Sequence, residues 1–268
     1  MPSPLPSIVL DPAAPPCLRL GPGEVHVWLA WADRFADPAL EPRLASIMTP
    51  DERAKQQRFI RPADRLLQLL ARALVRVLLS SYAGVPPADW RFDAGRYGKP
   101  FLVGPTVGLQ VAFNLSHTAG LVAAAFTTGA EVGVDVEWLG RRTATMHVAR
   151  RFFARTEVAA LERVPDAGRE ETFFAFWTLK EAYLKARGVG LSVPLGAFAF
   201  DLAAEPPGVS FEPPIDDRPE RWQFARRAPG PLHRLAVAVE RGTSPDHVIR
   251  VGEVEAPRRD ETDAEVFC

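Results

Sequence analysis

The sequence predicts an α+β fold. Ala63 to Tyr82 is a long, largely apolar segment with the pattern of a core helix, and Arg169 to Arg187 is expected to form a second long helix. Strand-like segments come in groups, so the strict alternation of strand and helix that builds a doubly wound parallel sheet is missing. With 268 residues, 47% of them hydrophobic, the chain can bury a sizeable core in one large domain or in two halves.

The first half opens on a proline-rich segment. Seven prolines among residues 1–23 remove helical and ladder hydrogen bonds, which predicts an extended tail. Val25 to Trp31 alternates enough for a strand. Thr49-Pro50-Asp51-Glu52 predicts a helix start, with Thr49 as the cap, proline at the first helical position and Glu52 three residues after the cap. After the long helix, two strands are expected around Ser116-His117, at Leu109 to Leu115 and Leu121 to Thr127.

The second half is expected to begin with a strand at Val132 to Glu137. Three helices then follow, near Thr143 to Phe153, Thr156 to Arg163 and Arg169 to Arg187. Short strands near Phe198, Trp222 and Leu235 to Val239 complete this half, and the charged tail from Pro257 onward is expected to be frayed.

Composition indicates an ordinary soluble enzyme. The net charge of −1 gives no global bias toward nucleic acid or a membrane, so neither is an expected partner. Cys17 and Cys268 lie near the two ends and imply no disulfide framework. No signal peptide or long apolar span is found, which predicts a cytoplasmic protein, and we expect a monomer.

Two carboxylates in the strand at Val132 to Glu137 suggest a metal site. Asp135 and Glu137 are two residues apart, so they point to one face of the strand, while the intervening valines form an apolar opposite face. Their mutual repulsion calls for a counter-charge, and hard oxygen ligands suit Mg²⁺. Glu181 would supply a third oxygen ligand. The alternative is a solvated or ion-paired strand end, because an Asp-x-Glu spacing arises by chance in a chain of this size.

The sequence resembles the 4'-phosphopantetheinyl transferases of secondary metabolism from about Trp28 to Val239. Two acidic motifs carry the resemblance, Gly133 to Glu137 and Trp177 to Lys185. Four further motifs match in the expected order: Arg96 to Pro100, Phe113 to Thr118, Arg151-Phe152-Phe153 with Thr156-Glu157, and Gly188 to Leu191.

The resemblance implies two pseudo-symmetric halves, each a small sheet packed on a long helix, with the active site in the cleft between them. The expected halves are residues 24–130 and 131–256, with a tail at 257–268. It also implies transfer of the 4'-phosphopantetheine arm of coenzyme A to a serine of an apo acyl, peptidyl or aryl carrier protein, with release of 3',5'-ADP. Which carrier is served stays open.

The resemblance assigns roles to residues of both motifs. Asp135, Glu137 and Glu181 would ligate Mg²⁺, with Mn²⁺ as an alternative, and the metal would bridge the pyrophosphate of coenzyme A. Either Glu181 or a metal-bound water would deprotonate the serine. Lys185, one turn beyond Glu181, would pair with a phosphate oxygen, and Lys180 would also contact coenzyme A.

The nucleotide end would be held by three groups of residues. Gly98, Lys99 and Pro100 would form a tight loop near the adenine. His117 would contact the 3'-phosphate, and Ser116 would also contact coenzyme A. Some of four basic residues would join them: Arg53, Lys55, Arg58 and Arg65. Read without the resemblance, His117 is a capping histidine and the basic residues form a solvated helix face. Glu52 and Leu67 stand where some relatives carry a basic residue.

Two other functions remain open from the sequence. One is a non-catalytic relative that binds coenzyme A or a carrier protein, against which the intact Asp135, Glu137, Glu181 and Lys185 argue. The other is an unrelated Mg²⁺-dependent phosphate enzyme, but the chain has no glycine-rich phosphate loop and its five histidines are scattered. Trp177 and its apolar neighbours on the same helix are expected to belong to the core: Phe173, Phe174, Phe176 and Leu184.

Overall fold

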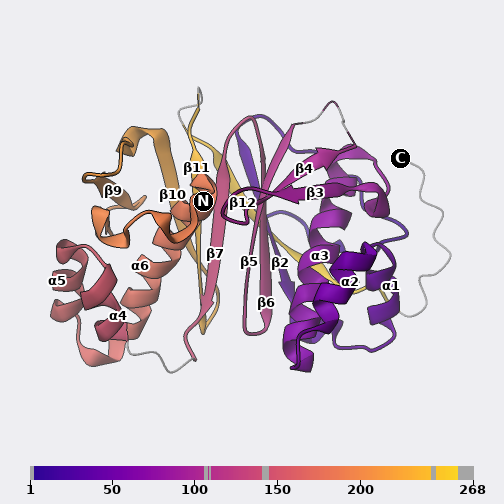
Figure 1. Cartoon of the computed structure of the whole chain (residues 1–268), viewed down its shortest axis with the longest axis horizontal. Coiled ribbons are helices and arrows are strands. Elements are labelled where there is room, and N and C mark those ends of the chain that lie inside the picture. Colours follow the sequence, from indigo (N-terminus) through magenta and orange to yellow (C-terminus); the bar gives the residue numbers. More distant parts are fainter. Residues whose placement is uncertain (1–2, 106–107, 109, 141–144, 243–245, 259–268) are drawn as a thin grey trace. The chain divides into compact units, whose positions relative to one another are not determined.

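The computed structural model describes residues 3–105, 108, 110–140, 145–242 and 246–258. The chain divides into two compact units (Figure 1). Unit 1 comprises residues 1–93, 100–129 and 248–268, and unit 2 comprises residues 94–99 and 130–247. Both units contain sheets and helices, which confirms the α+β class.

The main sheet of unit 1 has five strands. In spatial order they are β1 (Ile8–Val9), β12 (Val248–Glu255), β2 (Glu24–Trp31), β6 (Leu121–Thr128) and β5 (Val111–Thr118). β12 runs parallel to β1 and β2, and the pairs β2·β6 and β5·β6 are antiparallel. The predicted strands of the first half are therefore present, except that Leu109 lies outside the described residues.

The two ends of the chain differ from the expectation. The N-terminal segment is extended as predicted, but it is not a tail, because β1 pairs with β12 and Leu10 is fully buried. β12 was not expected, and its pairing with β2 places residues from Val248 onward in unit 1 rather than in the second half. The tail from Pro257 is described only as far as Arg258.

The helices of unit 1 cover its sheet. They are η1 (Ala32–Phe35), α1 (Leu40–Ser46), α2 (Pro50–Gln57), α3 (Pro62–Ala83) and η2 (Pro87–Asp89). A separate two-stranded hairpin is formed by β3 (Arg91–Ala94) and β4 (Pro100–Gly104). The capping box at Thr49 and Glu52 is confirmed, since each side chain bonds the backbone N–H of the other residue.

Helix α3 is the central helix of unit 1. It is the one described helix long and apolar enough to cross a membrane, but 72% of its apolar window is buried, as in a core helix of a soluble protein. It ends at Gly84, whose φ of 67° is the left-handed conformation that favours glycine at a helix C-terminus.

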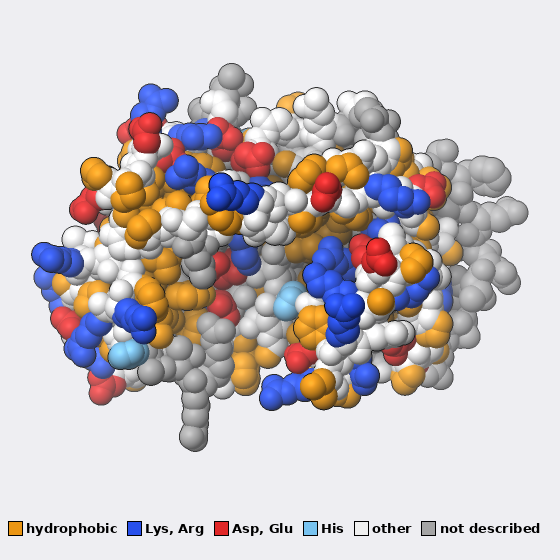
Figure 2. Space-filling model, in the orientation of Figure 1, with side chains coloured by type: hydrophobic (Ala, Val, Ile, Leu, Met, Phe, Trp, Pro, Cys, Tyr) orange, Lys and Arg blue, Asp and Glu red, His pale blue; other side chains and the backbone are white. Residues whose placement is uncertain are grey.

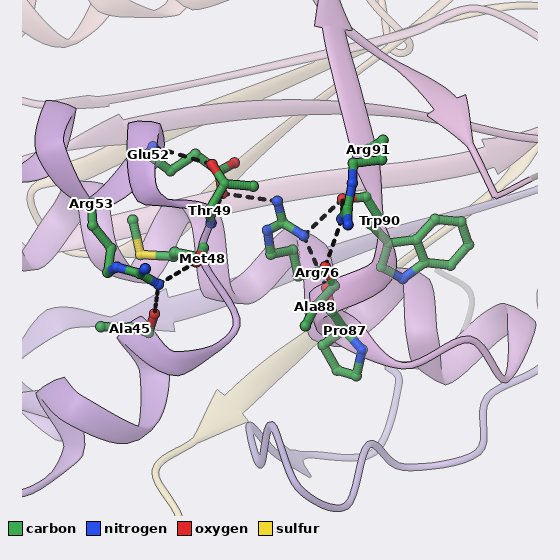
Figure 3. Close-up of polar contacts among 10 residues, drawn as sticks. All are labelled: Ala45, Met48, Thr49, Glu52, Arg53, Arg76, Pro87, Ala88, Trp90 and Arg91. Atoms are coloured by element: carbon green, nitrogen blue, oxygen red, sulfur yellow. Dashed lines mark hydrogen bonds and ion pairs between the residues drawn. The ribbon is translucent and has the colours of Figure 1, made fainter.

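A buried arginine joins α3 to two other segments of unit 1 (Figure 3). Arg76 is 1% exposed and donates to the carbonyls of Pro87 and Trp90. Its second nitrogen lies 2.8 Å from Glu52, the same residue that closes the capping box of α2. Both terminal nitrogens of this buried charge are thus matched, which fixes α2 and the η2 segment on α3.

The main sheet of unit 2 has the order β10 (Trp222–Gly230), β11 (His233–Glu240), β7 (Val132–Trp138), all antiparallel. β8 (Phe198–Asp201) and β9 (Gly208–Phe211) form a separate hairpin. The α-helices are α4 (Thr145–Phe152), α5 (Arg155–Arg163) and α6 (Asp166–Arg187), and short 3₁₀ turns are η3 (Gly190–Ser192), η4 (Leu195–Ala197) and η5 (Pro219–Arg221). The predicted elements of the second half are present; the predicted start of α4, Thr143 and Ala144, lies outside the described residues.

Unit 2 repeats the buried cation of unit 1. Lys180 of α6 lies eight residues before Gly188, as Arg76 lies eight residues before Gly84. Its ammonium is 2.8 Å from Glu157 and donates to the carbonyls of Leu195 and Phe198, which follow the helix. Glu157 also accepts the backbone N–H of Ala154, the N-cap of α5. Each unit is therefore stabilised internally by its own buried cation, which bonds a glutamate and two carbonyls. This structural repeat is not visible in the amino-acid sequence.

Candidate active site

The acidic motif lies where α6 packs against β7. Gly133, Asp135 and Glu137 share one face of the strand, opposite Ala238, Ala236 and Arg234 of β11. A Cβ at Gly133 would stand 2.0 Å from the carbonyl oxygen of Ala182 and 2.4 Å from the nitrogen of Ala186. Glycine is therefore required here for the backbone of α6 to touch β7, and this contact brings the helix residues to the acids.

Three charged side chains, those of Asp135, Glu181 and Lys185, meet where α6 packs on β7. Asp135 is 4% exposed, and the Lys185 ammonium lies 2.6 Å from its Oδ1. Burial and the negative charge of Asp135 raise the pKa of Glu181, while Lys185 acts in the opposite direction. Two carboxylates that repel each other beside one ammonium make a site that a further cation would stabilise.

The three predicted metal ligands are only partly assembled. Among the described residues, no group of three or more His, Cys, Asp or Glu side chains is placed as a set of metal ligands. Asp135 and Glu181 are nonetheless coupled through their charges, and their hard oxygens fit Mg²⁺. The metal and the three-ligand set stay a prediction.

Lys180 does not belong to this site. The sequence placed it among the residues that contact coenzyme A, but its side chain is 0% exposed and three acceptors surround its ammonium: Glu157 and the carbonyls of Leu195 and Phe198. The helical period explains this, because Lys180 and its neighbour Glu181 point about 100° apart, so only one of them can face the acids of β7.

Trp177 lies on the partly exposed side of α6, four residues before Glu181. It was expected in the core with its neighbours, and it is instead only partly buried, stacked on Phe153 and Phe173. The other four expected core residues of this helix are buried: Phe173, Phe174, Phe176 and Leu184.

The predicted nucleotide loop packs on the C-terminal end of α6. Lys99 lies 2.5 Å from Glu131 and donates to the carbonyl of Ala186 at 2.7 Å. A Cβ at Gly188 would come within 3.2 Å of the Lys99 side chain, so this glycine makes room for it. The charge of Lys99 is thus already paired, and contact of this loop with adenine stays a prediction.

In unit 1, His117 at the end of β5 meets α3. Its Nε2 lies 3.0 Å from Nε2 of Gln68, and the ring is exposed. The neighbouring Ser116 is 7% exposed. Arg65 and Arg72 lie one turn before and one turn after Gln68, so they share its side of the helix. Gln68 was not predicted from the sequence, because no local pattern marks a glutamine that contacts a strand residue 49 positions away.

The predicted basic residues divide by their contacts. Arg53 donates to the carbonyls of Ala45 and Met48 and so completes the end of α1 (Figure 3). Lys55, Arg58 and Arg65 are exposed, and within the described ranges no acidic side chain lies within 4.0 Å of them. These three remain candidates for an anionic ligand.

Comparison with known proteins places these features in a family. Residues 131–239 match the 4'-phosphopantetheinyl transferase superfamily, and residues 39–128 match the N-terminal domain described as 4'-phosphopantetheinyl transferase, N-terminal. The chain belongs to this family. The match at 131–239 contains Asp135, Glu181 and Lys185, and the match at 39–128 contains Gln68 and His117.

Individual relatives agree. The chain is 36% identical over 178 residues to 4'-phosphopantetheinyl transferase HetI of Nostoc sp., covering 66% of this chain and 74% of the relative. It is 32% identical over 227 residues to 4'-phosphopantetheinyl transferase ffp of Bacillus subtilis, covering 85% and 97%. The transferase Sfp of the same species is 29% identical over the same coverage. The resemblance predicted from the motifs is therefore confirmed, and the protein is a transferase.

Proposed function

We propose that this phosphopantetheinyl transferase moves the 4'-phosphopantetheine arm of coenzyme A to a serine of an apo carrier protein and releases 3',5'-ADP. The observation that supports this most is the cluster of Asp135, Glu181 and Lys185, which places two coupled carboxylates and one ammonium at the α6·β7 contact. A reaction between a pyrophosphate and a hydroxyl is favoured by carboxylates that can hold a divalent cation and by an ammonium that can meet a phosphate oxygen.

The residues of the cluster have separate tasks in this proposal. Mg²⁺, when bound by Asp135, Glu137 and Glu181, would neutralise the pyrophosphate. Lys185 would exchange part of its contact with Asp135 for a phosphate oxygen, since its side chain is 28% exposed and can reach a ligand. Either Glu181, where the metal does not fully engage its carboxylate, or a metal-bound water would accept the serine proton.

The 3'-phosphate of coenzyme A would bind in unit 1. His117 supports this because it is exposed and held by Gln68. Arg65, one turn away on the same side of α3, is the basic residue best placed to join it. Lys55 on α2 and Arg58 directly after it are further candidates, whereas Arg53 is already bound to backbone carbonyls.

Intact mass measurement tests the activity. Incubation with coenzyme A, Mg²⁺ and a panel of apo carriers should add one phosphopantetheine arm to at least one carrier. The mass gain should vanish with EDTA and return with Mg²⁺ or Mn²⁺. Full transfer in the presence of the chelator would reject the metal, and binding of coenzyme A without transfer to any carrier would favour the non-catalytic alternative.

A double cycle that combines the His117→Ala variant with dephospho-coenzyme A tests the proposed contact with the 3'-phosphate. Charge-assisted contacts contribute about 1.5–3 kcal/mol. His117→Ala should therefore raise KM for coenzyme A about tenfold and leave KM for dephospho-coenzyme A nearly unchanged. An equal effect on both substrates would show that His117 does not contact the 3'-phosphate.

We further propose that the enzyme acts in the cytoplasm as a monomer. Gel filtration with light scattering measures the oligomeric state.

A further inference from the structure

The turn between α2 and α3 exposes a large hydrophobic side chain. Ile60 is 92% exposed, far more than any other exposed large hydrophobic residue in the described part of the chain, where the next values are 55% for Val103 and 49% for Leu232. Isoleucine is among the residue types most often buried, and leaving it in water forgoes the stabilisation that burial gives. A single exposed hydrophobic residue is common on protein surfaces, so its surroundings decide whether it offers a contact to a partner.

Ile60 stands between two exposed arginines. Arg58 and Arg61 flank it in the chain, and neither side chain has a hydrogen bond or an acidic partner within 4.0 Å among the residues that the structure describes. Figure 2 shows Lys and Arg side chains gathered over the helices of unit 1. An apolar side chain within unpaired positive charge complements an acidic surface that has an apolar depression.

The turn is held in place by the fold. Gln56, which is 7% exposed, donates from its side chain to the carbonyl of Arg65, so the end of α2 is tied to the first turn of α3. Pro62 begins α3 at its first helical position and fixes the backbone there. The backbone that carries Ile60 is therefore held between two fixed helix ends, which lowers the entropy cost of docking.

The corresponding turn of unit 2 shows that this exposure is not a requirement of the fold. Between α5 and α6, Val164 is only partly exposed. Arg169 donates to the carbonyls of Leu161 and Val164 and pairs with Asp166 at 2.5 Å, so its charge is satisfied within the turn. The equivalent helix–turn–helix connection thus pairs its arginine within the turn in unit 2, whereas in unit 1 it leaves an apolar side chain and its neighbouring arginines exposed.

We infer that Ile60, with Arg61, is a docking surface for the apo carrier protein, which would receive Ile60 in an apolar depression surrounded by acidic side chains. This inference rests on the proposed function, since it takes the carrier to be the protein substrate. The surface would set affinity for the carrier and would leave the affinity for coenzyme A unchanged.

Steady-state kinetics with the wild-type enzyme and two variants test the inference, using an apo carrier that the mass assay shows to be modified. Ile60→Asp should raise KM for the carrier about tenfold or more, because burial of one isoleucine is lost and a negative charge is added. Arg61→Glu should raise it by several-fold at low salt and by less at high salt. KM for coenzyme A, measured at saturating carrier, should not change in either variant.

Matched controls separate docking from general surface effects. Val103→Asp changes another exposed hydrophobic residue of unit 1, and Arg19→Glu reverses another exposed charge; both should leave KM for the carrier unchanged. Melting temperatures check that the variants fold.

Two results would overturn the docking surface alone: an unchanged KM for the carrier in Ile60→Asp, or a rise only in KM for coenzyme A, which would assign the turn to the nucleotide. If the wild-type enzyme modifies no carrier at all, the proposed function fails, and the docking surface fails with it.

Discussion

The pair of β2 and α3 in unit 1 and the pair of β7 and α6 in unit 2 have equivalent places in the two units but pack differently. Helix α6 packs closely on β7, whereas α3 lies nearer to β6 and β5 than to β2. β2, β6 and β5 have the same order and antiparallel pairing as β7, β11 and β10. Both helices have 22 residues and end at a left-handed glycine. The two units therefore share one framework, and their differences show where unit 2 carries charged side chains in place of apolar packing.

Equivalent positions of the two strands show the difference most clearly. In unit 1, Trp28 lies opposite Ala124, is fully buried and donates to Tyr82 of α3. In unit 2, Asp135 lies opposite Ala236 and contacts Lys185 of α6. An indole fills the space in one unit, and a carboxylate beside an ammonium occupies it in the other. Unit 1 uses this position for packing and unit 2 uses it for a charged site.

The buried cations should give the largest effects on stability. Arg76→Met and Lys180→Met each leave a glutamate and two carbonyls without their partner, and breaking a buried pair costs about 3–5 kcal/mol. Denaturant unfolding measures the free energy of each variant, with Arg19→Met as an exposed control that should change it by less than about 0.5 kcal/mol. A loss below about 1 kcal/mol for only one of the two would show that the devices are not equivalent.

The strand positions should separate stability from activity. Trp28→Ala should cost about 3–5 kcal/mol of unfolding free energy through a core cavity. Asp135→Ala should cost about 1 kcal/mol, because Lys185 is partly exposed and water can solvate it, yet it should abolish phosphopantetheine transfer. Thermal melting and the mass assay measure the two quantities. Similar melting shifts in both variants would contradict the contrast between the units.

A substitution that disturbs the close approach of α6 to β7 should reduce stability nearly as much. Gly133→Ala places a methyl group against the helix backbone, which cannot move aside as a side chain can, so we expect a loss of about 3 kcal/mol and reduced transfer. Gly208→Ala is the control, because the nearest atom to its added Cβ is 3.8 Å away. A Gly133→Ala variant that melts like the wild type would show that this glycine is not needed to bring α6 against β7.

The smallest expected effect concerns His26, which stands in β2 where β7 has Gly133. Burial lowers the pKa of His26, against the opposing effect of Glu24 and with a minor contribution from Arg250. Because its folded-state pKa is depressed, the unfolded chain binds the proton more readily, so this residue should reduce stability as pH falls below about 6.5. His26→Gln should weaken the pH dependence of unfolding between pH 7 and pH 5. An unaltered dependence would assign it to other groups.

Local sequence patterns were enough to predict many of the secondary-structure elements and the family of this protein. The capping box of Thr49 and Glu52 was readable because it involves residues three apart. The strand at Val132 to Glu137 and its acidic face were readable because side chains alternate along a strand. Six motifs in order then identified the family, which the comparisons confirm.

Only the tertiary structure decided the rest, because it depends on contacts between distant residues. Lys180 and Lys185 belong to one motif, yet the first is sealed against Glu157 and the second faces Asp135. The pairing of β12 with β2 joins residues more than 200 positions apart, and no local pattern encodes it. The sequence could name the acids and lysines of the site, but which lysine reaches the acids follows from how the helix rests on the strand.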